Sequence, residues 1–102
     1  MDTLVRIKRA VLAGDYVFSG KAVVGMEADR IAEFDVVESI LTAVAIYKTV
    51  RARSPYRAHA RERLHIIQST NLDGLAIYTK GKLVSEAGRD TYYFLVSSKR
   101  AL

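Results

Sequence analysis

The chain has 102 residues, of which 50% are apolar, with no cysteine and a formal net charge of +5. This length suits one hydrophobic core, and the lack of cysteine excludes a disulfide framework, a thiolate metal site and a cysteine nucleophile. No apolar run reaches the roughly 20 residues that a membrane-spanning helix needs, and the N-terminus lacks the charged-then-apolar order of a secretion signal. We therefore expect a single domain over residues 1–102, located in the cytoplasm and without membrane contact.

Two to three helices are predicted in the first part of the chain, residues 1–42. The first covers about 3–13, where apolar residues recur at helical spacing, and Gly14 is suited to end it. Ser19 is a candidate N-cap for a short second helix, and a third begins at about Glu33. These helices are predicted to be scaffold.

From residue 43 onward, β-branched and aromatic residues become frequent, which predicts strands. The four expected strands cover about 44–51, 63–69, 75–80 and 91–98. Asn71-Leu72-Asp73-Gly74 predicts a tight turn between the second and third of them, and a polar turn around Glu86-Ala87-Gly88 precedes the last. The predicted fold class is α+β, with the helices on one face of a four-stranded, mainly antiparallel sheet and the other face open to a ligand.

Positive charge is concentrated in the predicted sheet half. Residues 1–42 carry five Lys/Arg and seven Asp/Glu, a balance of −2, whereas residues 43–102 carry eleven and four, a balance of +7. The densest basic stretch runs from Lys48 to Arg63. Such a concentration favours a polyanionic partner, with a solvated basic loop as the structural alternative.

Several classes of chemistry lack the residues that they need. No glycine-rich dinucleotide fingerprint and no phosphate loop is present, which leaves nucleotide cofactors without support. His59 and His65 are the only histidines and the acidic residues of the second half are scattered, so neither a metal site nor a carboxylate pair is indicated. We expect no cofactor and no metal.

The predicted strands and the basic stretch supply side chains that suit RNA. In metal-free RNA cleavage the ribose 2′-hydroxyl attacks the adjacent phosphate, which requires a proton acceptor, a proton donor and cations. Histidine exchanges protons near neutral pH, lysine and arginine bind phosphate, and tyrosine donates a hydrogen bond or stacks on a base. The candidate residues are Tyr47, Lys48, Arg51, Arg53, Arg61, Arg63, His65, Gln68, Tyr78, Lys80, Lys82, Lys99 and Arg100.

Each candidate also has a structural interpretation. His65 lies between Leu64 and Ile66 and equally suits a structural histidine in a central strand. Lys48 falls on an otherwise apolar strand face, where an unpaired ammonium is costly, so we expect it to border a cleft or a carboxylate. Gln68 suits a cross-strand hydrogen bond, and Tyr78 suits packing.

Short segments along nearly the whole chain carry a family resemblance. They are residues 12–16 (LAGDY), 19–22 (SGKA), 34–40 (FDVVESI), 46–49 (IYKT), 63–66 (RLHI), 74–80 (GLAIYTK) and 95–101 (LVSSKRA). In this order they resemble the compact RelE-like ribonuclease toxins of bacterial toxin–antitoxin pairs, particularly their MqsR-like and BrnT-like branches. The resemblance implies the RelE-like toxin fold.

The resemblance also implies an activity. Such toxins are metal-independent endoribonucleases that cleave mRNA and are neutralised by a cognate antitoxin, with which they form a hetero-oligomer. The resemblance assigns a catalytic lysine to Lys48 and a second to Lys80 or Lys99, between which the alignment does not choose. His65 falls where the MqsR-like branch has a functional tyrosine, so its chemistry would differ.

Two alternatives stay open beside the toxin hypothesis. The same basic face suits a non-catalytic RNA-binding or protein-interaction module, in which cations contact phosphates and tyrosines stack on bases without proton transfer. It also suits an acidic protein partner, whose affinity would fall with salt.

Overall fold

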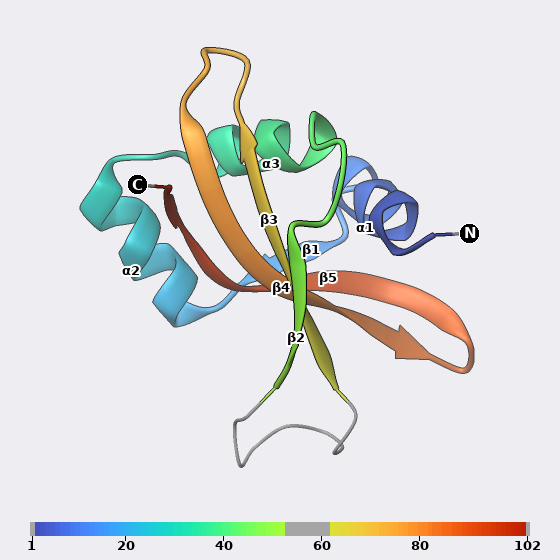
Figure 1. Ribbon diagram of the computed structural model, residues 1–102. Coiled ribbons are helices and arrows are strands. Elements are labelled where there is room, and N and C mark those ends of the chain that lie inside the picture. The colour runs from blue at the N-terminus through green and yellow to red at the C-terminus, as the bar shows by residue number, and fades with distance from the viewer. Residues whose placement is uncertain (1, 53–61, 102) are drawn as a thin grey trace.

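The elements follow the order helix, strand, helix, helix and then four strands in residues 2–52 and 62–101, the part of the chain that the computed structural model describes (Figure 1). The helices are α1 (Thr3–Leu12), α2 (Gly20–Asp29) and α3 (Glu33–Leu41). The strands are β1 (Tyr16–Phe18), β2 (Lys48–Arg51), β3 (Arg63–Thr70), β4 (Ala76–Glu86) and β5 (Arg89–Arg100). The α+β class predicted from the sequence is confirmed.

Helices α1 and α2 begin at short polar residues that accept a hydrogen bond from a free amide of the first turn. Asp2 Oδ1 accepts from the Val5 amide at 2.9 Å, and Ser19 Oγ accepts from the Ala22 amide at 3.0 Å. Each bond satisfies an amide that has no partner within the helix. The cap predicted at Ser19 is confirmed.

The sheet has the strand order β1-β5-β4-β3-β2 in the described residues. Strand β1 pairs with β5 in parallel, and the remaining neighbours pair antiparallel. The expectation of four mainly antiparallel strands is therefore corrected to five strands in a mixed sheet. The missed strand, Tyr16–Phe18, is only three residues long, and so short a segment shows no alternation that distinguishes a strand from a loop.

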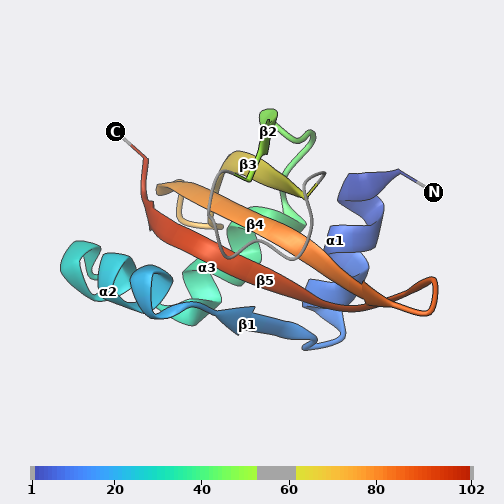
Figure 2. The ribbon, with the colours of Figure 1, turned by 90° about the horizontal axis from the view of Figure 1, so that it is seen from below.

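The hydrophobic core lies between one face of the sheet and the helices. Figure 2 shows α1 and α3 behind the sheet, and α2 alongside β5 beyond the end of β1. The central strands contribute alternate residues to this core, because successive side chains of a strand point to opposite faces. In the described residues the helices pack on the core face, and the opposite face of the central strands has no helix over it (Figure 2). The core cluster contains Ile7, Ala10, Val11, Met26, Ile31, Val36, Ile40, Ala43, Ile67, Ile77, Tyr93 and Leu95.

The predicted turn before β4 is confirmed, and a buried asparagine holds it. Asn71 Oδ1 accepts from the amides of Asp73 at 3.0 Å and Leu75 at 2.8 Å. Its Nδ2 donates to Asp35 Oδ1 on α3 at 3.1 Å. The turn is therefore fixed to the helical layer as well as to its own strands.

An ion pair joins α1 to the start of β5. Arg6 Nε and Nη2 donate to the two carboxylate oxygens of Asp90 at 2.8 and 2.7 Å. The hydrogen bonds from Arg6 lower the pKa of Asp90 to about 2. An unfolded aspartate has a pKa of about 3.9, so this carboxylate stabilises the fold above that pH and loses its contribution as the pH falls toward 2.

We expect Asp90→Asn to reduce the dependence of stability on pH. Between about pH 5 and pH 2, the free energy of unfolding of the variant should fall less steeply than that of the unchanged protein, because the titrating carboxylate is gone. Urea denaturation at a series of pH values measures this. Equal slopes for the two proteins would contradict the role given to the Arg6–Asp90 pair.

Candidate functional site

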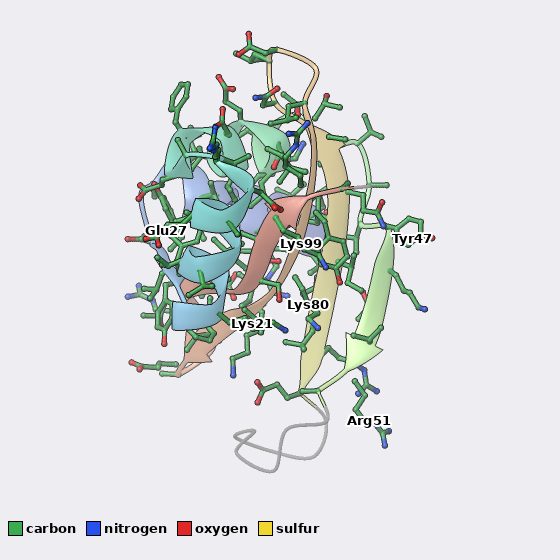
Figure 3. The ribbon with its side chains drawn as sticks, turned by 90° about the vertical axis from the view of Figure 1, so that its left-hand side faces the viewer. Lys21, Glu27, Tyr47, Arg51, Lys80 and Lys99 are labelled. Atoms are coloured by element: carbon green, nitrogen blue, oxygen red, sulfur yellow. The ribbon has the colours of Figure 1, made fainter. Side chains whose placement is uncertain are left out.

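Three lysines from three elements line one hollow on the sheet. Lys21 comes from α2, Lys80 from β4 and Lys99 from β5. Figure 3 shows their side chains in the same region, between α2 and the sheet. The hollow has a volume of about 280 Å³, and we call it the lysine hollow. Its described lining residues are Lys21, Val24, Gly25, Tyr78, Lys80, Ser97, Ser98 and Lys99.

A β-bulge in β5 turns Lys99 toward this hollow. Gly81 pairs with Leu95 but Lys80 pairs with Ser97, so Val96 is an extra residue in β5. Because side chains alternate along a strand, one extra residue moves every later side chain of β5 to the face opposite the one it would otherwise take. Lys99 consequently pairs with Tyr78 on the face without helices, and its Nζ lies 5.0 Å from the centre of the Tyr78 ring.

Helix α2 brings Lys21 to the hollow because its start is hydrogen-bonded to the bulge. The Ser19 amide donates to the Leu95 carbonyl at 2.9 Å, and Ser19 Oγ donates to the Val96 carbonyl at 2.8 Å. Farther along α2, a Cβ at Gly25 would lie only 2.7 Å from the Ser98 carbonyl oxygen. The helix therefore packs directly on the β5 backbone.

Lys21 was not among the candidates from the sequence, although one signal was present. A helix N-terminus carries a partial positive charge, so a lysine in the first turn is unfavourable there unless a neighbouring anion compensates it. Lys21 lies directly after Gly20, the first residue of α2. This local conflict is the kind that functional sites tolerate.

The charge of the lysine hollow is of one sign. Its described lining residues include three lysines and no aspartate or glutamate. Lys48 extends the row on the same face, because it pairs with Ile66, and Ile66 pairs with Lys80. Adjacent strands are about 4.8 Å apart, which places the Lys48 and Lys80 backbones roughly 10 Å from each other. Phosphate oxygens are the natural ligands of such an arrangement.

Lys48 and His65 are not brought together. His65 follows Leu64 and precedes Ile66, whose side chains point to the face of Lys48, so the imidazole points to the opposite face. There Nδ1 lies 3.1 Å from Thr49 Oγ1. Burial lowers the pKa of His65, and the positive charge of Arg6 lowers it further. The lowered pKa favours the neutral form of His65, which faces the helical layer.

This burial predicts a pH effect on stability. The folded-state pKa of His65 lies below the value of about 6.5 of an unfolded histidine, so the unfolded chain binds the proton more readily and the fold loses stability as pH falls below that value. His65→Gln should reduce the decrease in the free energy of unfolding between pH 7 and pH 5. Chemical denaturation at these two pH values is the test, and an unchanged decrease would contradict the prediction.

The remaining candidates fall into separate places. Gln68 and Tyr78 form one cross-strand row with Lys99, beside the lysine hollow. Arg51 pairs with Arg63, and Figure 3 shows Tyr47 and Arg51 on β2 or beside it, away from the three lysines. Lys82 forms an ion pair with Glu62. Arg53 and Arg61 lie outside the described residues, whereas the backbone amide of Arg100 donates to Asp29.

Comparisons with known proteins give no relative to argue from. No protein-family model, no curated protein sequence and no solved structure matches this chain. In residues 2–52 and 62–101, no group of three histidine, aspartate or glutamate side chains is placed to hold a metal ion. Over the same residues, no helix has the length and apolar character needed to cross a bilayer.

Proposed function

We propose that this protein is a metal-independent endoribonuclease toxin of the cytoplasm, which cleaves mRNA at the lysine hollow and is neutralised by a bound antitoxin protein. The observation that carries the proposal is the convergence of Lys21, Lys80 and Lys99 from separate elements. Three ammonium groups without a lining carboxylate give the hollow a positive potential, and the phosphates of RNA supply the complementary negative charge.

The chemistry assigned to the hollow needs no cofactor. The ribose 2′-oxygen attacks the adjacent phosphorus and the bond from phosphorus to the 5′-oxygen breaks, which leaves a 2′,3′-cyclic phosphate and a 5′-hydroxyl. Lysine ammonium groups stabilise the charge that develops on the phosphate oxygens, and one of them gives a proton to the leaving 5′-oxygen. Solvent accepts the 2′-hydroxyl proton, because His65 faces the other side of the sheet.

RNA suits this surface better than an acidic protein does, because an aromatic ring and a side-chain amide lie beside the lysines, and such groups stack on nucleobases and hydrogen-bond to them. Tyr78 and Gln68 lie in the row that ends at Lys99. An aromatic ring and an amide next to a phosphate site are typical of single-stranded RNA recognition.

A second function, RNA binding without cleavage, is favoured by the position of His65. A binding module needs the same cations and the same aromatic ring, and it needs no proton acceptor at the phosphate. Under this alternative, the protein would bind RNA with an affinity that falls steeply with salt, and would leave it intact.

Expression in a bacterial host separates the two functions. The toxin proposal predicts growth arrest and loss of mRNA when the protein is expressed alone, with rescue when the neighbouring open reading frame is co-expressed. A triple variant that replaces Lys21, Lys80 and Lys99 by alanine should cause no arrest at equal protein levels. Normal growth with abundant soluble wild-type protein would contradict the toxin proposal.

A further inference from the structure

A second hollow adjoins the lysine hollow and differs from it in charge. It has a volume of about 490 Å³ and is lined by Asp29, Gln68, Tyr78, Lys99, Arg100 and Ala101. Tyr78 and Lys99 line both hollows, so the two share a wall. We call this one the Asp29 hollow. A ligand that fills both hollows passes over the Tyr78 ring and the Lys99 ammonium.

The polar groups of the Asp29 hollow are held in place by backbone structure. Asp29 is the last residue of α2, and its Oδ2 accepts from the Arg100 amide at 2.9 Å. This bond holds the carboxylate against the edge of β5. Gln68 is exposed on β3 and pairs with Tyr78, which pairs with Lys99, so these three side chains lie in one row across the sheet.

A carboxylate in this position selects what the hollow accepts. Asp29 repels phosphate and offsets part of the positive charge of Lys99 and Arg100, which also line this hollow. It accepts hydrogen bonds from N–H donors, which the edges of nucleobases present. Guanine offers two adjacent donors, N1–H and the 2-amino group, whereas inosine offers only the first. The hollow therefore has the chemistry of a base subsite next to a phosphate subsite.

We propose that the Asp29 hollow binds the nucleobase adjacent to the phosphate held by Lys21, Lys80 and Lys99, and that it prefers guanine. This inference rests on the proposed function, since it requires RNA in the lysine hollow. Asp29 and Gln68 contact the base edge, and Tyr78 lies against the base at the wall that the hollows share.

The test uses short single-stranded RNAs with 2′-O-methyl riboses, which lack the attacking 2′-hydroxyl and therefore stay intact while binding is measured. They are identical except at one position, which carries guanosine, inosine, adenosine or uridine. Binding is measured by fluorescence anisotropy at two salt concentrations. The unchanged protein should bind the guanosine RNA roughly tenfold more tightly than the inosine RNA, the order of effect expected for one good base-edge contact. Asp29→Asn should remove this difference while it keeps the salt dependence.

Glu27→Gln is the matched control, because it makes the same change of charge on the same helix. Figure 3 shows Glu27 directed away from the three lysines. Gln68→Ala is the second test variant, since this exposed side chain can be removed without loss of a core contact. Gln68→Ala should also weaken the preference for guanosine. Because Gln68 lies on β3, this result would not depend on the contact between Asp29 and the Arg100 amide, which Asp29→Asn alters.

The possible outcomes separate failure of the guanine subsite from failure of the proposed RNA function. Loss of the guanosine preference in Asp29→Asn and its retention in Glu27→Gln support the base subsite. Equal binding of the guanosine and inosine RNAs by the unchanged protein overturns the guanine subsite and leaves RNA binding intact. Failure to bind any RNA overturns the proposed function itself, and the subsite with it.

Discussion

Replacing Lys80 by alanine is expected to slow RNA cleavage about 100-fold or more, which is the cost of removing one group that stabilises transition-state charge. Lys80 has the central position, since it lies in the row between Lys48 and Ser97 and lines the hollow with Lys21 and Lys99. Single-turnover rates on a short RNA, measured in the presence of EDTA, give the effect directly.

Arg89→Ala is the control for Lys80→Ala. It removes the same charge from an exposed position next to the β4–β5 turn, outside the lining of both hollows. Its cleavage rate should stay within about twofold of that of the unchanged protein, because screening weakens the effect of a remote surface charge. Equal losses in the two variants would mean that overall charge, and not the hollow, governs the reaction.

Gly81→Ala is expected to lower the free energy of unfolding by about 3 kcal/mol, at the upper end of the usual cost of overpacking a core. A Cβ at this position would lie 2.7 Å from the Phe94 carbonyl oxygen and 2.7 Å from Cζ of Tyr93. Tyr93 is fully buried, so its ring has no room to withdraw. The strands β4 and β5 would have to separate at the bulge that directs Lys99.

Gly20→Ala is the comparison for Gly81→Ala. No heavy atom lies within 4 Å of a Cβ built on Gly20, the first residue of α2. There the replacement should leave stability unchanged or raise it by about 0.5–1 kcal/mol, because alanine loses less backbone entropy in a helix. Urea denaturation of both variants is the measurement. A loss below about 0.5 kcal/mol for Gly81→Ala would contradict the close packing described for β4 and β5.

Local signals in the sequence were sufficient for much of the fold. The Ser19 cap and the Asn71–Gly74 turn are each specified by residues within a few positions, and both are confirmed. The predicted strand over 63–69 is also found, as β3, and its alternation places Leu64 and Ile66 on one face and His65 and Ile67 on the other. The face that received no helix, predicted from helices packing on one side only, is the face that carries the lysine hollow.

The parts that the sequence did not predict depend on contacts between distant segments. Strand β1 pairs with the edge of β5, and its own three residues, although suited to a strand, are too few to show the alternation that identifies one. The bulge at Val96 is set by packing of β5 on β4, and it alone decides which face Lys99 takes. Lys21 joins the site through the contact of α2 with β5. Lys48 and His65 were both candidates for the site, and the alternation of faces places them on opposite sides of the sheet.

Cleavage of RNA by the purified protein in EDTA tests the central claim most directly. A single-stranded RNA of mixed sequence is incubated with the protein, and the ends of the products are analysed. The lysine hollow predicts fragments with 2′,3′-cyclic phosphate and 5′-hydroxyl ends, formed without metal ions and lost with Lys80→Ala. RNA of varied sequence left intact by the folded protein would contradict the claim that the lysine hollow cleaves it.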